Sequence, residues 1–215
     1  GKVAVVVGAT KKSGMGFSAA KALASNGADV IVTGLTEPRP DLDFRNVYSA
    51  NSDEGELEER ANELTALGVR SLALPVDITC ETQIQSCRDI ILSEFERIDI
   101  LFNNAGTAAG VGSFLELPES AWDLSYQVNL KGTALFSKAV LPSMIELGGG
   151  SIINNSSVWA QKVAPFSAAY SSTKAAVIAL TNSLPMEKEH DDKIKTLTPK
   201  IMLRYAPGQM RNLQS

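Results

Sequence analysis

The sequence predicts an α/β protein in which helices cover both faces of a doubly wound, parallel β-sheet. Two observations support this prediction. Short runs rich in β-branched residues alternate with longer amphipathic stretches, which is typical of buried parallel strands joined by crossover helices. A glycine-rich segment also follows the first run directly, as in a Rossmann-like fold. We therefore expect a three-layer αβα sandwich that forms a single domain over residues 1–215.

The expected strands and helices alternate along the chain. Apolar runs predict strands at residues 3–7, 29–33, 70–76, 98–102 and 151–155. Helical periodicity predicts helices at about 14–26, 53–67, 80–96, 119–145 and 167–190. The stretch KIKTLTP at 193–199 is a candidate for a short sixth strand. Ligands of such sheets bind beyond the carboxyl ends of the strands, near the point where the strand order reverses.

Two segments depart from this regular order. Residues 34–52 contain two prolines and little periodicity, so we expect an extended loop that lies near the ligand. Residues 185–215 lose the earlier pattern, and we expect irregular structure there.

Composition and charge exclude several classes of protein. A net charge of −4 without a dense basic run argues against binding to nucleic acid or to an anionic membrane. No stretch approaches the apolar length of a membrane span, and the first residues lack the features of a signal peptide, so we expect a cytoplasmic location. His190 is the sole histidine, which excludes a histidine-rich metal site and a Ser-His-Asp triad. We expect no metal, and Cys80 and Cys87 as free thiols.

The glycine-rich segment GATKKSGMG places Gly8, Gly14 and Gly16 between the first strand and the first helix. Glycine permits a tight turn and close backbone approach, and the N-terminus of the following helix offers unpaired N–H groups to an anion. This position favours a pyrophosphate cradle. An ordinary strand-to-helix turn is the alternative.

Polar groups also end the third and fourth strands, which meet at one edge of the sheet. Asp77 can accept a hydrogen bond from an adenine amino group, and backbone groups of Asn103 and Ala105 can face a ribose. The alternatives are a helix cap at Asp77 or Thr79 and an ordinary turn after the fourth strand.

Tyr170 and Lys174 are spaced to lie on one face of a helix, within reach of a common ligand. An ammonium near a phenol favours the phenolate and lowers the pKa of the tyrosine, as general acid–base chemistry requires. Ser157 ends the preceding strand region and can donate a hydrogen bond to a substrate oxygen. A solvent-facing pair without a catalytic role is the alternative.

The motifs taken together strongly resemble the classical short-chain dehydrogenase/reductase family over about residues 1–184. They are the glycine loop, NNAG at 103–106, VNLKG at 128–132, NNSSVWA at 154–160 and YSSTK at 170–174. The resemblance implies that Tyr170 is the proton donor or acceptor and that Lys174 lowers its pKa and binds the nicotinamide ribose. It also implies that Ser157, rather than Ser156, positions the reacting oxygen. Asn129 would hold a water that links Lys174 to bulk solvent.

The same resemblance implies an NAD(P)-dependent oxidoreductase that acts on a small-molecule carbonyl or secondary alcohol, as a homodimer or homotetramer assembled through the helices at 119–145 and 167–184. The alternative is a nucleotide-binding sensor or scaffold on the same fold. Carried over residue by residue, the implied cofactor contacts are Gly8, Lys12, Gly14, Met15, Gly16, Leu35, Asp77, Ile78, Asn104, Ala105, Gly106, Tyr170 and Lys174.

Three features depart from the family pattern. The glycine loop is longer by two residues and contains Lys11 and Lys12. Gly34 and Leu35 stand where an acid would bind the 2′-hydroxyl of NAD, so NADP is favoured with Lys11, Lys12 and Arg39 as candidate phosphate ligands, whereas Glu37 would serve NAD. Pro199 is followed by a lysine where the family has glycine. Too few residues follow for the lid and last strand of the family, so we expect either that the chain as given lacks part of them or that it is a divergent, shortened member.

Overall fold

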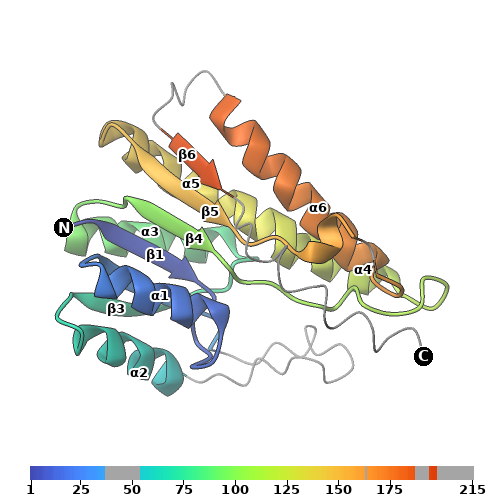
Figure 1. Cartoon of the computed structure of the whole chain (residues 1–215), viewed down its shortest axis with the longest axis horizontal. Helices are drawn as coiled ribbons and strands as arrows, with labels where there is room; N and C mark the ends of the chain where they lie inside the picture. Colours follow the sequence, from blue (N-terminus) through green and yellow to red (C-terminus); the bar gives the residue numbers. More distant parts are fainter. Residues whose placement is uncertain (37–53, 163, 187–193, 198–215) are drawn as a thin grey trace.

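The computed structural model describes residues 1–36, 54–162, 164–186 and 194–197. Within these residues the strands form one parallel sheet in the order β3-β2-β1-β4-β5-β6 (Figure 1). The order reverses between β1 and β4, as the prediction of a doubly wound sheet requires. The strands are β1 Val3–Val7, β2 Asp29–Gly34, β3 Ser71–Pro75, β4 Ile100–Asn103, β5 Gly150–Asn154 and β6 Ile194–Leu197. The predicted fold class and all six strands are confirmed.

The helices lie on both faces of this sheet (Figure 1). They are α1 Met15–Ser25, α2 Glu54–Thr65, α3 Glu81–Phe95, α4 Glu119–Ser125, α5 Thr133–Glu146 and α6 Ala168–Ser183. Side chains of β1 alternate between two cores: Ala4 and Val6 belong to the core under α1 and α2, whereas Val3, Val5 and Val7 belong to the core under α3 and α5. Within the described residues no helix has the length and apolar character needed to cross a bilayer.

The single helix predicted at 119–145 is wrong in one respect. A π-helical segment, η2 Tyr126–Gly132, separates α4 from α5. Its wider turn carries Asn129, which is fully buried and whose side-chain amide bonds Thr107 in the loop after β4. The helix predicted at 167–190 is α6 followed by the short 3-10 helix η4 Leu184–Met186. The loop predicted at 34–52 and the irregular tail lie largely outside the described residues.

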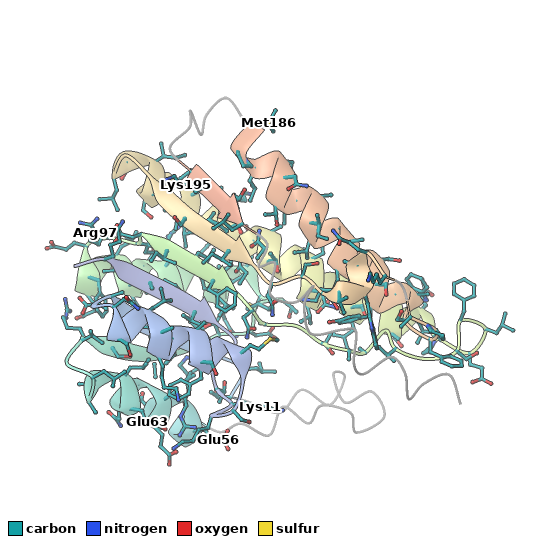
Figure 2. The ribbon with its side chains drawn as sticks, in the orientation of Figure 1. Lys11, Glu56, Glu63, Arg97, Met186 and Lys195 are labelled. Atoms are coloured by element: carbon teal, nitrogen blue, oxygen red, sulfur yellow. The ribbon has the colours of Figure 1, made fainter. Side chains whose placement is uncertain are left out.

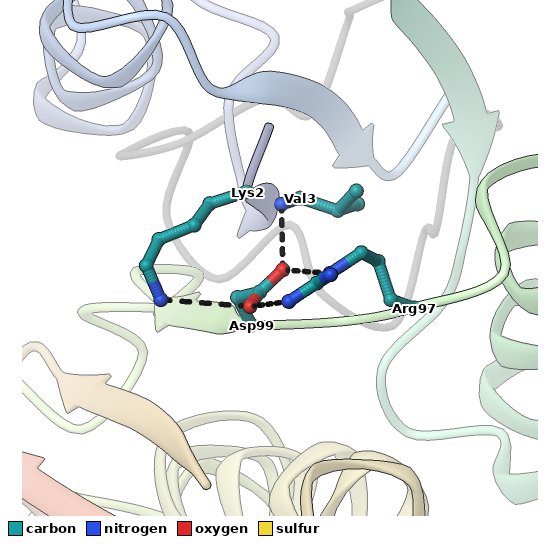
Figure 3. A network of polar contacts seen from close by, with 4 residues as sticks. All are labelled: Lys2, Val3, Arg97 and Asp99. Carbon is teal, nitrogen blue, oxygen red and sulfur yellow. Dashed lines mark hydrogen bonds and ion pairs between the residues drawn. The ribbon is translucent and has the colours of Figure 1, made fainter. Parts of the chain in front are cut away.

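A polar network holds β1 against β4 at the edge of the sheet opposite their carboxyl ends (Figure 3). The buried carboxylate of Asp99 accepts hydrogen bonds from the Val3 N–H at 2.9 Å and from the Arg97 guanidinium at 2.6 and 2.8 Å, and Lys2 approaches to 3.5 Å. Burial by itself would raise the pKa of Asp99, but the guanidinium of Arg97, the Val3 N–H and the Lys2 ammonium hold it below its usual range.

Asp99→Asn is expected to lower the free energy of unfolding at neutral pH by about 1–3 kcal/mol, because it removes the charge that these donors stabilise. The native pKa is depressed, so this contribution is present above the unfolded pKa of about 4 and is lost as pH falls through the native value. Urea unfolding at neutral and acidic pH measures the effect. Asp89→Asn, at an exposed position paired with Arg88, is the control. An equal effect of the two substitutions would contradict the prediction.

Candidate active site

A cavity of about 370 Å³ lies at the carboxyl edge of the sheet, beside the point where the strand order reverses. It is lined by the glycine loop and by the segments that follow β2, β4 and β5, and by α6. Nine predicted site residues line it: Gly8, Gly14, Met15, Leu35, Asn104, Ala105, Gly106, Tyr170 and Lys174. A second cavity of about 150 Å³ shares Gly8, Leu35 and Ala105 with the first and is also lined by Asp77 and Ile78. The two cavities therefore adjoin each other at the ends of the strands.

The glycine loop packs too closely for side chains at two of its glycines. Gly8 has a φ of +83°, and a Cβ there would lie 2.7 Å from the Cα of Ala105. A Cβ on Gly16 would overlap the carbonyl oxygen of Gly8 and the side-chain amide of Asn104. These contacts bring the N-terminus of α1, with its unpaired N–H groups, to the cavity wall. The arrangement is suited to a pyrophosphate.

The two adjacent lysines of the loop point to different surroundings. Lys11 lines the cavity, whereas the ammonium of Lys12 pairs with Glu63 of α2 at 3.2 Å, and Lys12 lies outside the cavity lining. Lys11 and Glu63 are both labelled in Figure 2. The structure thus separates Lys12 from the other predicted cofactor contacts. Arg39 and Glu37 lie outside the described residues.

Thr10 leaves no room for a side chain at Gly34, one of the two positions where an acid would bind the 2′-hydroxyl of NAD. A Cβ on Gly34 would overlap the Thr10 hydroxyl, so the glycine loop already occupies the space that a side chain would need there. Thr10 also lines the cavity. Sequence reasoning missed this residue, although its place between Gly8 and Lys11 was a usable signal.

A chain of hydrogen bonds crosses the carboxyl edge from the glycine loop to α6. The Asn104 amide donates to the carbonyl of Gly8 at 2.7 Å, and the Asn155 amide donates to the Asn104 side-chain oxygen at 3.0 Å. The carbonyl of Asn155 then accepts from the Lys174 ammonium at 2.9 Å. Asn155 also lines the cavity and was not predicted. Asn103, by contrast, is buried and bonds Ser137 and Asn154 beneath this edge.

Lys174 is buried, with 4% of its surface exposed, and burial lowers the pKa of its ammonium to about 8. The side chains of Lys174 and Asn129 both lie beside Gly106. A Cβ atom added to Gly106 would be 3.2 Å from the Lys174 ammonium nitrogen and 3.1 Å from the Asn129 side-chain oxygen. The Asn129 amide bonds both backbone groups of Thr107 and the hydroxyl of Thr173. Lys174 therefore sits in a fixed, largely dehydrated position beside the cavity.

Tyr170 lies one turn before Lys174 on α6 and lines the same cavity. Its ring packs edge-on against Trp159, with the ring centroids 5.8 Å apart. The two candidate serines differ in their bonding. Ser156 donates its hydroxyl to the carbonyl of Lys174 at 2.7 Å, whereas the Ser157 oxygen accepts from the N–H of Trp159 at 3.2 Å. The Ser157 contact does not use the hydroxyl hydrogen, which is consistent with the prediction that Ser157 positions the reacting oxygen. Of the two serines, Ser156 is the one that lines the cavity.

The described residues contain no cluster of histidine, cysteine or acidic side chains that could hold a metal ion. Cys80 and Cys87 are free thiols, as predicted. Burial raises the pKa of the Cys87 thiol to about 12.

Comparisons with known proteins agree with this geometry. The family model for short chain dehydrogenases matches residues 41–202. A short chain dehydrogenase of Pseudocercospora fijiensis is 35% identical over 191 residues, which cover 88% of this chain and 55% of that relative. The chain spans 64% of the length of several other curated relatives.

Solved structures give the same result. The chain superimposes on carveol dehydrogenase from Mycobacterium avium in complex with NAD with a TM-score of 0.83 and 29% identity, covering 92% of this chain and 69% of that one. A variant of actinorhodin polyketide ketoreductase with NADPH gives a TM-score of 0.78 and 27% identity, covering 92% and 68%.

Lys174→Met is expected to raise the free energy of unfolding at pH 7 by about 2 kcal/mol. The substitution removes the cost of burying the charged ammonium, about 3 kcal/mol, and this gain outweighs the loss of the hydrogen bond to Asn155. The native pKa lies below the unfolded value of about 10.4, so the wild type gains stability as pH rises from about 8, and the difference between the proteins shrinks. Urea unfolding over this pH range is the measurement. Lys138→Met, at an exposed position on α5, should show no such convergence.

Proposed function

The chain belongs to the short-chain dehydrogenase/reductase family, and we propose that it is an NAD(P)-dependent oxidoreductase that interconverts a carbonyl and a secondary alcohol. One observation supports this most directly. Tyr170 and Lys174 project from one face of α6 into the cavity that the glycine loop also lines. A proton-handling pair and an anion cradle therefore share one space, as hydride transfer from a dinucleotide requires.

In this proposal the residues of the chain supply the proton and orient the substrate. The bound nicotinamide would supply or accept the hydride. Tyr170 donates its phenolic proton to the carbonyl oxygen during reduction and takes it back during oxidation. Ser157 donates a hydrogen bond to the same oxygen and so stabilises negative charge as it develops. Lys174, fixed by the carbonyl of Asn155, favours the phenolate of Tyr170.

The cofactor would bind along the carboxyl edge of the sheet. Gly8, Gly14, Met15 and Gly16 would hold the pyrophosphate at the N-terminus of α1. The second cavity, with Leu35, Asp77 and Ile78, would receive the adenine end, and Asn104, Ala105 and Gly106 would line the ribose and nicotinamide path. Asn129 would hold a water between Lys174 and solvent, which its place beside Gly106 supports.

NADP is the preferred cofactor in this proposal. Lys11 lines the larger cavity together with Gly34 and Leu35 at the end of β2, and the described residues that line this cavity include no carboxylate to oppose a 2′-phosphate. Both cofactor types occur among the structural neighbours: the carveol dehydrogenase holds NAD and the ketoreductase holds NADPH.

The remaining proposals concern the protein in its setting. By family resemblance, the chain would form one domain of a homodimer or homotetramer in the cytoplasm, with a small-molecule carbonyl compound or alcohol as its substrate. The helical segments α4 to α5 and α6 would supply the subunit contacts, and Tyr126, which is 52% exposed between α4 and α5, supports this surface.

Tyr170→Phe is expected to lower turnover of a ketone panel by about 10²–10⁴-fold or more, because it removes the transferable proton while keeping the ring that packs against Trp159. Binding of the reduced cofactor, followed by nicotinamide fluorescence, should be unchanged. Lack of turnover in the wild type, with cofactor bound, would favour the sensor or scaffold instead.

Lys11→Ala is expected to weaken NADPH binding by about tenfold while leaving NADH binding unchanged, because only NADPH carries the 2′-phosphate. Parallel fluorescence titrations with NADPH and NADH give both dissociation constants. Lys12→Ala is the matched control, since Lys12 pairs with Glu63 outside the cavity. Equal losses for both cofactors, or a wild-type preference for NADH, would contradict NADP specificity.

A further inference from the structure

Phe166 adopts a backbone conformation that a bulky residue rarely takes. Its φ is +61°, in the left-handed region, and its side chain is 66% exposed, so no core packing compensates for the strain. The surrounding bonds hold it there: its carbonyl accepts from the Gly112 N–H at 2.7 Å, and the hydroxyl of the next residue, Ser167, donates to Ala164 at 2.6 Å. Strain of this kind clusters at functional sites, and Phe166 lies four residues before Tyr170, just ahead of the start of α6 at Ala168.

Trp159 places a second aromatic ring at the same end of α6. Its indole packs edge-on against the Tyr170 ring at 5.8 Å, with the ring planes at 87°. Trp159 lies in the 3-10 helix η3 Val158–Ala160, and its backbone N–H donates to the side-chain oxygen of Ser157. Trp159 therefore contacts both Tyr170 and Ser157, the two residues that would hold the reacting oxygen. A substrate substituent beside that oxygen would meet the indole ring.

The segments around Tyr170 carry few charged side chains. The loop after β4 approaches α6 so closely that a Cβ on Gly110 would lie 2.8 Å from the backbone nitrogen of Tyr170. Farther along this loop, Phe114 and Leu115 are 67% and 93% exposed. Residues 107–118 and 156–167 contain one acid, Glu116, and one base, Lys162. A charged substrate would find few partners on these two segments.

We propose that Trp159 and Phe166 are specificity-determining residues that form an aromatic rim beside Tyr170, and that the substrate is a bulky, uncharged, apolar ketone or secondary alcohol. The inference rests on the proposed function and extends it to a substrate class. The left-handed Phe166 keeps its side chain, despite the strained backbone, because the ring contacts the substrate.

The test compares a bicyclic ketone such as 2-decalone with the short keto acid pyruvate, using the wild type with its preferred cofactor. We expect a kcat/KM for the bicyclic ketone at least about tenfold higher, since burying one ring against an aromatic wall corresponds to more than a tenfold change in binding. Trp159→Ala and Phe166→Gly should each lower it about tenfold, mainly through KM, and leave the cofactor dissociation constant unchanged.

Phe166→Gly separates a substrate contact from a structural role. Glycine adopts a positive φ without strain, so the thermal midpoint should stay unchanged or rise while catalytic efficiency falls. Retention of full selectivity by both variants would overturn the proposal, as would preference for the keto acid. If Phe166→Gly changed the sedimentation of the protein but kept its substrate selectivity, the ring would be assigned to a contact between copies of the chain. That result would also overturn the proposal.

Direct binding keeps the proposal testable if no ketone is turned over. In a Trp122→Phe background Trp159 is the sole tryptophan, and 2-decalone should quench its fluorescence saturably in the cofactor-bound protein. Binding without turnover would refute the proposed oxidoreductase while supporting the aromatic rim. Absence of binding in a protein that does reduce pyruvate would refute the rim alone.

Discussion

The burial of one ammonium group organises the carboxyl edge of this protein. An unpaired charge in a dehydrated position would be strongly destabilising, so Lys174 requires a fixed acceptor, and the carbonyl of Asn155 provides it. Asn155 in turn bonds Asn104, which bonds Gly8. The ends of β1, β4 and β5 and the middle of α6 are thereby joined in one line, and the candidate proton-handling group and the glycine loop cannot move independently.

A second layer of buried polar side chains lies beneath this line. Asn103 bonds Ser137 and Asn154, and Asn154 bonds Thr181 of α6. These amides satisfy one another away from water, which fixes α5 and α6 relative to β4 and β5. At the opposite edge Asp99 performs the corresponding task for β1 and β4. The central strands are therefore held at both ends by directional contacts, while their middles are held by apolar packing.

The site concentrates features that are unfavourable for stability. Burial of Lys174 penalises its charged form, and Phe166 holds an aromatic side chain at a positive φ. Gly8 and Gly16 admit backbone contacts that no side chain would permit. The surrounding sheet, with its two apolar cores, provides the stability that allows these features to persist.

The sequence by itself determined the fold class, the strands and most of the residues around the cavity. Parallel strands buried on both faces must be continuous apolar runs, and the turns at their carboxyl ends must carry the glycines and polar groups, so both patterns are visible in one dimension. The spacing of Tyr170 and Lys174 likewise requires only a helix.

Tertiary structure decided the features that depend on contacts between distant segments. Lys11 and Lys12 are chemically alike, and only the position of Glu63 on α2 turns one of them away from the cavity. Thr10 fills the space beside Gly34 at the end of β2. Asn155 connects the glycine loop to Lys174 through hydrogen bonds that span 19 to 96 residues of the chain. The π-helical segment that carries Asn129 likewise has no periodic signature, because its side-chain partners lie in the loop after β4 and on α6. Local patterns record local geometry, whereas these choices arise from packing between elements that the sequence keeps apart.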